Sequence, residues 1–222
     1  MLWIIAGVIL VGVVRCAWAS RGTSAVTPGE ALARLKEGNA RFADGRGIHP
    51  NADAARRQET TAEGQHPVAT VVSCSDSRVP VEILFDQGIG DVFVVRVPGN
   101  VCNADEIGAV EYGVEHLNTP LCVILGHTRC GAVTGVVMGE ALHGNLASLV
   151  TNIRNAAVKA RKQNPTLDDA ALVEPTARAN VQQSIDDLLR GSPSVRELSR
   201  QGSVKIIGAM YDIATGRVEW IA

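Results

Sequence analysis

The chain has 222 residues, a length that fits one well-buried domain and is short for two. Apolar residues make up 46% of it and charged residues 20%, which is ordinary for a globular protein and argues against bulk disorder. The formal net charge is −2 and no basic block is present, so the charge pattern of a nucleic-acid-binding protein is absent.

The first residues differ in composition from the rest. Residues 1–14 carry no charge and are shorter than the roughly 20 apolar residues of a membrane-spanning helix. Ala17-Trp18-Ala19 then has the small-x-small pattern of a signal-peptidase site. We therefore predict a signal peptide over 1–19, a single catalytic domain over 20–222, and export to the periplasm or the medium. Because no basic residue precedes the apolar run, two alternatives stay open: a membrane anchor formed by residues 1–14, or a misassigned start codon on a cytoplasmic protein.

The first half of the mature chain alternates helices and strands. A capping box with proline at the first helical position opens a helix at Thr27. The β-branched run from Val68 to Val72 is typical of a strand buried on both faces. The predicted elements, in order, are a helix 28–42, a polar loop 43–66 with a short helix around 53–60, a strand 68–72, a short helix 80–85, a strand 91–97, a helix 105–117 and a strand 121–125.

The second half is mainly helical and returns to the sheet at its end. The predicted elements are helices 131–138, 146–162, 175–189 and 192–200, a core strand 204–211, and a hairpin partner 217–221 at the sheet edge. Strands that alternate with helices indicate parallel pairing with right-handed crossovers. We predict an α/β fold with a central, mainly parallel β-sheet of about four core strands plus an edge strand, flanked by helices.

Metal-binding side chains follow two of these strands. Cys74, Asp76 and Arg78 come after the first strand, where an extended backbone would aim all three the same way. His127 and Cys130 come after the third strand, at the start of a helix. Because ligands of open α/β sheets bind at the carboxyl ends of the strands, we expect the two groups to meet there. Three thiolate and imidazole ligands with one open position are typical of catalytic zinc.

Asp76 has two possible partners in this site, the metal and Arg78. An aspartate on zinc would close the fourth position, whereas an aspartate held by the guanidinium would leave it free for water. Zinc lowers the pKa of bound water to about 7. An Asp–Arg pair could then accept the hydrogen bond of that water and orient its lone pair toward an electrophile.

Four cysteines remain after residue 19: Cys74, Cys102, Cys122 and Cys130. An even count in an exported chain is compatible with two disulfides, but two of these cysteines stand beside other metal-binding groups, which favours zinc. Cys122 lies within an apolar strand and is expected to be a buried small hydrophobic residue. The sequence assigns no role to Cys102.

The paired motif Cys74-x-Asp76-x-Arg78 and His127-x-x-Cys130 resembles the signature of the β-class carbonic anhydrases. The resemblance extends from about Ala31 to Ile221. It implies one Zn²⁺ per subunit on Cys74, His127 and Cys130, reversible hydration of carbon dioxide to bicarbonate and a proton by a zinc-bound hydroxide, and a homodimer or homotetramer. It also implies that Asp76 and Arg78 form a catalytic dyad, with Asp76 as a displaceable fourth metal ligand.

The resemblance further implies roles for residues that would line the substrate cleft. Gln65 matches a glutamine that hydrogen-bonds the substrate, Phe93 and Tyr112 match apolar or aromatic cleft residues, and Gly131 matches the glycine after the last ligand. Part of each cleft would come from the neighbouring subunit. Val71 stands where relatives closed by bicarbonate carry a tryptophan, which implies that this chain lacks that bicarbonate switch.

Two other functions remain compatible with these motifs. Some relatives use the same metal site to hydrolyse carbon disulfide or carbonyl sulfide. A non-catalytic zinc-binding protein would also need the three ligands, but it would need neither Asp76 nor Arg78. No nucleic acid and no stable membrane span after processing are expected.

Overall fold

The computed structural model of the chain describes residues 26–221. The predicted signal peptide, residues 1–19, lies outside the described residues and stays a prediction. Within residues 26–221, no helix is both long enough and apolar enough to cross a membrane.

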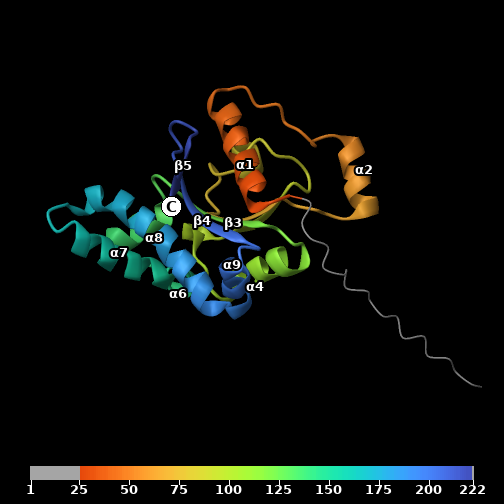
Figure 1. Cartoon of the computed structure of the whole chain (residues 1–222). Coiled ribbons are helices and arrows are strands. Elements are labelled where there is room, and N and C mark those ends of the chain that lie inside the picture. Colours follow the sequence, from red (N-terminus) through yellow and green to blue (C-terminus); the bar gives the residue numbers. More distant parts are fainter. Residues whose placement is uncertain (1–25, 222) are drawn as a thin grey trace, which may run out of the picture.

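A five-stranded sheet lies at the centre of the molecule (Figure 1). Its strands are β1 (Ala69–Ser73), β2 (Val92–Arg96), β3 (Leu121–His127), β4 (Lys205–Tyr211) and β5 (Val218–Ile221). They lie in the order β2-β1-β3-β4-β5, with parallel pairing from β2 through β4 and antiparallel pairing of β4 with β5. The predicted α/β fold and its antiparallel edge strand are therefore confirmed.

The two middle strands show why their sequences are continuously apolar. Every residue of β1 and β3 is buried, because helices cover both faces of the sheet. Strand β3 ends two residues later than predicted, since its pairing with β4 continues to the pair His127–Tyr211. His127 therefore lies on the strand itself and not at the start of the following helix, as its spacing from Cys130 suggested.

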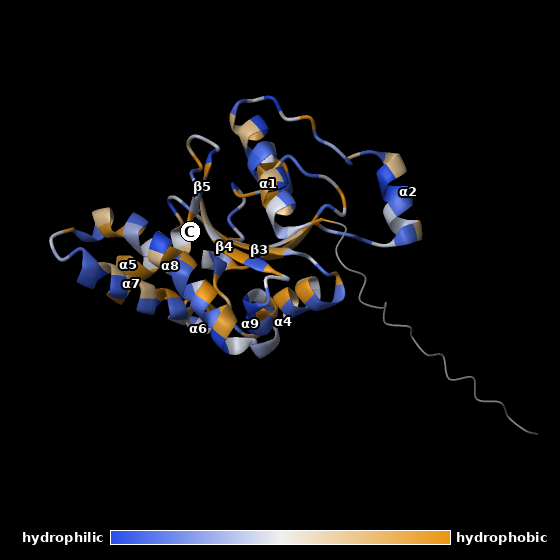
Figure 2. Cartoon of the chain, viewed as in Figure 1, coloured by the Kyte–Doolittle hydropathy of each residue, from blue (hydrophilic) through white to orange (hydrophobic). Residues whose placement is uncertain are grey.

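The helices of the described residues are α1 (Pro28–Ala43), α2 (Ala54–Glu63), α3 (Val81–Leu84), α4 (Ala104–Glu111), α5 (Gly131–Val137), α6 (Gly144–Leu149), α7 (Thr151–Gln163), α8 (Asp169–Gly191) and α9 (Pro193–Arg200), with a 3₁₀ turn η1 (Pro98–Asn100) and a π-helical turn η2 (Tyr112–His116). Helices α1 and α3 share one hydrophobic cluster with the sheet, and α4, α5, α7, α8 and α9 share the other. Figure 2 shows this division, with apolar colour along the strands and on the helix faces turned toward them.

Helix α8 corrects one predicted boundary. It begins at Asp169 and not at Pro175, which lies inside it. The side chain of Asp168 accepts the N–H of Ala171 and thereby caps the helix seven residues before the proline. Proline has no N–H, so the carbonyl of Ala171 lacks its usual helical partner at residue 175. The prediction that this helix starts at Pro175 was therefore wrong.

Two other predicted helices are interrupted. The helix expected over 146–162 divides into α6 and α7 at Val150, a fully buried residue with ψ of 8°. The helix expected over 105–117 widens into η2 after Glu111. A side-chain carbon at Gly113 would lie 2.2 Å from the hydroxyl of Thr70, so the glycine allows this turn to lie directly on β1.

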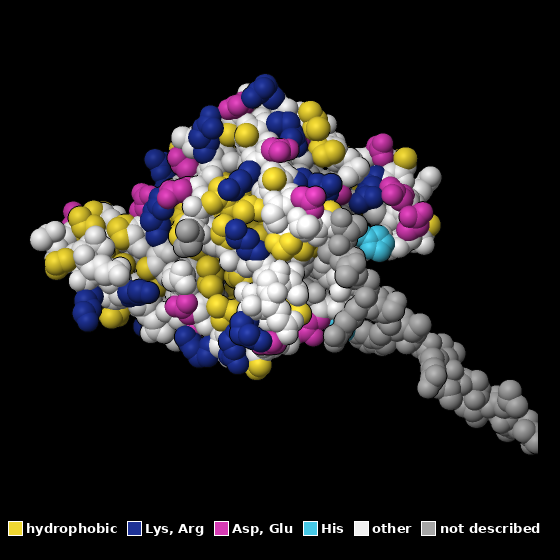
Figure 3. Space-filling model, viewed as in Figure 1, with side chains coloured by type: hydrophobic (Ala, Val, Ile, Leu, Met, Phe, Trp, Pro, Cys, Tyr) yellow, Lys and Arg dark blue, Asp and Glu magenta, His cyan; other side chains and the backbone are white. Residues whose placement is uncertain are grey.

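The surface carries both signs of charge. Figure 3 shows Lys and Arg side chains interspersed with Asp and Glu side chains over the face in view. Helix α2 stands apart from the sheet and has no buried residue. Arg56 ties it to the start of β2 by donating to the carbonyl of Ile89 at 2.8 Å and pairing with Asp91 at 3.2 Å.

Candidate metal centre

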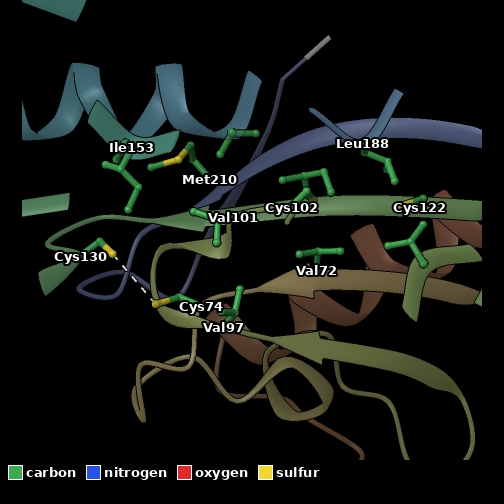
Figure 4. Packing of buried hydrophobic residues seen from close by; sticks show 14 of the residues in the cluster. Val72, Cys74, Val97, Val101, Cys102, Cys122, Cys130, Ile153, Leu188 and Met210 are labelled. Carbon is green, nitrogen blue, oxygen red and sulfur yellow. Dashed lines mark hydrogen bonds between the residues drawn. The ribbon is translucent and has the colours of Figure 1, made fainter. Parts of the chain in front are cut away.

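The structure brings Cys74, His127 and Cys130 together at the carboxyl edge of the sheet. Cys74 follows β1, His127 ends β3, and Cys130 is the N-cap residue of α5. Strands β1 and β3 are parallel neighbours, so their carboxyl ends coincide. One donor atom from each of the three residues lies within 4.8 Å of the other two. Figure 4 shows the two cysteine side chains pointing toward each other, with their sulfur atoms 4.0 Å apart.

His127 presents one ring nitrogen to this cluster. Its side chain is fully buried, and Nδ1 lies 2.9 Å from the carbonyl oxygen of Thr128. A proton on Nδ1 donated to that carbonyl leaves the lone pair on Nε2, the tautomer that metal-binding histidines adopt. Among the described residues Nε2 has no hydrogen-bond partner. A buried nitrogen without a partner is costly, and a metal ion would satisfy it.

The two thiols differ in acidity, and Cys74 loses its proton more readily than Cys130. The thiol of Cys130 faces Cys74, and hydrogen bonding from it is the main reason why the pKa of Cys74 falls to about 4. The same contact with a neighbouring thiolate, together with burial, raises the pKa of Cys130 far above the usual range. The pair therefore holds one negative charge readily, and a cation would be needed to stabilise both thiolates.

Asp76 and Arg78 form a close ion pair beside the cluster. The Arg78 guanidinium donates from Nε to Oδ1 at 2.9 Å and from Nη2 to Oδ2 at 2.6 Å. These bonds hold the pKa of the Asp76 carboxyl well below its usual range. The Asp76 Oδ2 atom lies 4.0 Å from His127 Nε2. The carboxylate is thus next to the cluster, with both oxygens already bound by arginine.

The backbone between Cys74 and Arg78 is not extended, and that expectation was wrong. The chain turns at Ser77 and Arg78, and the N–H of Val79 donates to the carbonyl of Asp76 at 3.0 Å. The turn lets the Arg78 N–H and guanidinium reach the same Asp76 oxygen. In an extended strand, the Asp76 carboxylate and the Arg78 guanidinium would point the same way side by side without this contact.

Arg96 is a further member of the site that the sequence did not predict. It ends β2 and donates to two carbonyl oxygens of the Cys74–Arg78 loop, from Nε to Cys74 at 3.0 Å and from Nη2 to Asp76 at 2.6 Å. Its position at the carboxyl end of a predicted strand could have marked Arg96 as a candidate site residue. The contact itself depends on the parallel register that pairs Ser73 with Arg96.

The predicted cleft residues lie at different distances from the cluster. Gly131 directly follows Cys130 and is exposed. Phe93 and Tyr112 pack against each other, with ring centroids 5.8 Å apart. Phe93 pairs with Thr70, three residues before Ser73, so this aromatic pair lies about 10 Å back along the strands. Gln65 is exposed in the loop before β1, at the opposite end of that strand.

The remaining cysteines and Val71 occupy the core. Cys102 and Cys122 are buried, and all four cysteines of the described residues are free thiols. Burial raises the pKa of Cys122 to about 12, as expected for a small hydrophobic residue in a strand. Val71 is fully buried between α1 and the sheet.

Comparison with known proteins identifies the family. A protein-family model described as carbonic anhydrase matches residues 69–218. This chain belongs to the carbonic anhydrase family. The carbonic anhydrase of Mycolicibacterium smegmatis is 37% identical over 196 residues, covering 86% of this chain and 92% of that protein. Carbonic anhydrase 2 of Mycobacterium tuberculosis is 37% identical over 194 residues, covering 86% and 91%.

Solved structures place the carbonic anhydrase in the β class that its motifs predicted. A β-carbonic anhydrase of Aspergillus fumigatus superposes with a TM-score of 0.68 at 27% identity, covering 87% of this chain and 89% of that one. The Coccomyxa β-carbonic anhydrase superposes with a TM-score of 0.67 at 25% identity, covering 86% of each chain. The chain is therefore a β-class carbonic anhydrase with a Cys-His-Cys site able to bind a metal ion.

Proposed function

We propose that this enzyme interconverts carbon dioxide and bicarbonate with one Zn²⁺ per subunit, held by Cys74, His127 and Cys130. The observation that carries the proposal is the group of three buried donor atoms within 4.8 Å of one another. Two sulfur atoms and one imidazole nitrogen suit zinc better than the hard cations Mg²⁺ and Ca²⁺, which prefer oxygen. Three protein ligands also leave the fourth position of a tetrahedral site open.

The proposed chemistry divides between the metal and the dyad. Bound zinc would supply hydroxide near neutral pH by lowering the pKa of water to about 7. Arg78 fixes the Asp76 carboxylate in one orientation through its bidentate hold. The lowered pKa of Asp76 keeps this group an acceptor, so it can take a hydrogen bond from the nucleophile and orient it toward carbon dioxide. The side chain of Arg78 is about half exposed to solvent, at 51%.

Asp76 could also serve as a displaceable fourth metal ligand. That role competes with the ion pair, because each carboxylate oxygen that binds the metal must leave Arg78. Both oxygens are bound by Arg78 in this structure, which supports the arrangement with an open metal position.

The substrate is tested by turnover of carbon dioxide, carbonyl sulfide and carbon disulfide on one zinc-loaded preparation. We expect hydration of carbon dioxide to be far faster than hydrolysis of carbonyl sulfide or carbon disulfide, and Asp76→Asn to slow it strongly. Efficient hydrolysis of either sulfur compound, with slow hydration of carbon dioxide, would assign the alternative activity. Bound zinc with no turnover of any of the three compounds would indicate a non-catalytic zinc-binding protein.

We further infer that the chain assembles as a homodimer or homotetramer. Within the described residues, the outer edge of β2 has no strand partner. Tyr112 is 44% exposed and covers Phe93 near this edge, and neither residue reaches the cluster of its own chain. The fungal β-carbonic anhydrases of Sordaria macrospora, which share the fold at a TM-score of 0.69 and 24% identity, are described as tetrameric.

We propose that the mature enzyme begins near Ser20 and lies outside the cytoplasm. The support is the uncharged run of residues 1–14 ahead of Ala17-Trp18-Ala19. Mass spectrometry of the protein from its native host measures the mature amino terminus. A soluble cytoplasmic product that keeps residues 1–19 would contradict the proposal.

A further inference from the structure

Cys74 accepts hydrogen bonds from two backbone N–H groups. Asp76 donates to its Sγ at 3.4 Å from the same loop. Gly99 donates at 3.3 Å from the η1 turn that follows β2. Such outer contacts fix the position of a metal-binding sulfur and reduce its negative charge. The Gly99 contact is the one that depends on a distant part of the chain.

Gly99 lies in a conformation that few other residues adopt. Its φ is +76°, in the left-handed region that favours glycine. A side-chain carbon there would approach Cδ1 of Ile153 on α7 to 2.5 Å. The N–H of Gly99 therefore reaches the sulfur only while this turn keeps its shape under α7.

Asn180 holds Gly99 from the other side. It lies on α8, is fully buried, and donates from Nδ2 to the carbonyl oxygen of Gly99 at 2.7 Å. Gly99 thus donates to the sulfur through its N–H and accepts from α8 through its carbonyl. The two hydrogen bonds connect α8, the longest helix within residues 26–221, to the Cys74 thiol through a single residue.

The Asn180 side chain lowers the stability of the folded protein through one of its two polar atoms. Its Oδ1 is buried and has no hydrogen-bond partner among the described residues. An unsatisfied buried polar atom destabilises the folded protein, and leucine has the same branched shape without such an atom. Packing alone therefore does not explain the amide, whereas its bond to Gly99 does.

We propose that Asn180 is a positioning residue of the metal centre, holding Gly99 so that its N–H stays on the Cys74 sulfur. The inference rests on the proposed zinc site and adds a residue that does not touch the metal. Helix α8 contributes no metal ligand, but through Gly99 it would influence the affinity and geometry of the metal site.

The test compares Asn180→Leu with Thr176→Val, a matched control one turn earlier on α8. Thr176 is also fully buried, and its hydroxyl has no partner among the described residues. Zinc affinity is measured by competition with a chelator, and the Co²⁺-loaded protein reports the cobalt–thiolate absorption bands. We expect Asn180→Leu to bind zinc about 10–100-fold more weakly and to shift those bands. Thr176→Val should match the wild type in both measurements.

The outcomes separate the inference from the function on which it rests. A folded Asn180→Leu protein with wild-type zinc affinity and unchanged cobalt bands overturns the inference alone. A wild-type protein that binds no zinc overturns the proposed function. If Asn180→Leu does not fold, Asn180→Ser takes its place, because its hydroxyl is too short to reach Gly99 and the same two measurements apply.

Discussion

At the scale of single residues, Arg78 is the side chain that holds Asp76 beside the metal-binding cluster. The guanidinium binds both oxygens of Asp76 and also donates to the carbonyl of Arg129 at 3.2 Å. Arg129 has φ of +54°, an uncommon backbone conformation for a residue other than glycine. The loop between two proposed ligands, His127 and Cys130, therefore helps to hold the dyad.

Arg78→Ala should keep its metal and its fold but lose activity. Without the guanidinium, Asp76 has the metal as its strongest remaining partner and closes the open position. A misplaced electrostatic group at a reacting centre costs on the order of 10²–10³ in rate. Arg78→Lys should recover only part of this loss, because a lysine cannot bind both oxygens in the same way.

The measurement is metal content and carbon dioxide turnover on the same samples. Arg200→Ala is the matched control, since Arg200 is an exposed arginine paired with Glu197 on α9. It should behave as the wild type. Near wild-type turnover in metal-loaded Arg78→Ala would mean that the dyad does not operate in this enzyme.

At the scale of elements, the strands and the metal-binding residues were predictable because they depend on local patterns. Continuous apolar runs marked β1 and β3, and parallel pairing brings their carboxyl ends together. The meeting of Cys74, His127 and Cys130 therefore followed from their residue types and their places after two predicted strands, although His127 proved to lie on β3 itself. The Asn180–Gly99–Cys74 connection did not, because it joins a helix, a left-handed turn and a thiol that are far apart in sequence.

The errors in helix bounds have two origins, a competing local cap and tertiary contacts. Pro175 is a strong local signal, but the Asp168 cap begins α8 earlier. Val150 ends α6 through its burial, which depends on the packing of the finished core. The turn at Gly113 depends on its contact with Thr70. The differences at Val150 and Gly113 arise where tertiary contacts outweigh local preference, whereas the Asp168 cap is a second local signal that outweighs the proline.

Asp86 should be the main link between α1 and the loop that follows it. It is 1% exposed, binds Arg41 at 2.6 Å, and accepts the N–H groups of Ile48 and His49. Removing one partner of such charged hydrogen bonds costs about 2–3 kcal/mol. Asp86→Asn should therefore lower the free energy of unfolding at pH 7 by roughly this amount, measured by urea denaturation.

The effect of Asp86→Asn should depend on pH. Burial opposes ionisation of Asp86, but the bonds from Arg41 and the loop outweigh it, and its pKa in the folded protein is lowered from 3.8. A lowered pKa stabilises the folded state above the unfolded value, and this contribution is lost as pH falls through the folded value. The difference in free energy of unfolding between Asp86→Asn and the wild type should have its full size above about pH 4 and should shrink below that pH. A difference that stayed constant down to pH 3 would show that the charge of Asp86 does not contribute.

At the scale of the whole molecule, the assembly proposed above would complete the substrate cleft. Gln65, Phe93 and Tyr112 do not meet the metal ligands of their own subunit, so their proposed roles depend on assembly. Tyr112→Ala should weaken the assembly and lower turnover while leaving zinc content unchanged. Sedimentation velocity over a range of concentrations, with activity at the same concentrations, measures both effects. Met138→Ala serves as the control, because Met138 is comparably exposed at the end of α5.

If Tyr112→Ala kept both its wild-type oligomeric state and its wild-type turnover, the aromatic pair would have no part in a shared cleft. A wild-type enzyme that sediments as a fully active monomer would contradict the assembly proposal itself.

The most direct test of the central claim is removal and restoration of the metal on the wild-type enzyme. Stopped-flow hydration of carbon dioxide is followed as a chelator removes zinc and as zinc is returned, with metal content measured on each sample. We predict that turnover disappears with the metal and returns in proportion to zinc, reaching its full value at one Zn²⁺ per subunit. Full turnover by metal-free protein, or one bound zinc per subunit without hydration of carbon dioxide, would contradict the account.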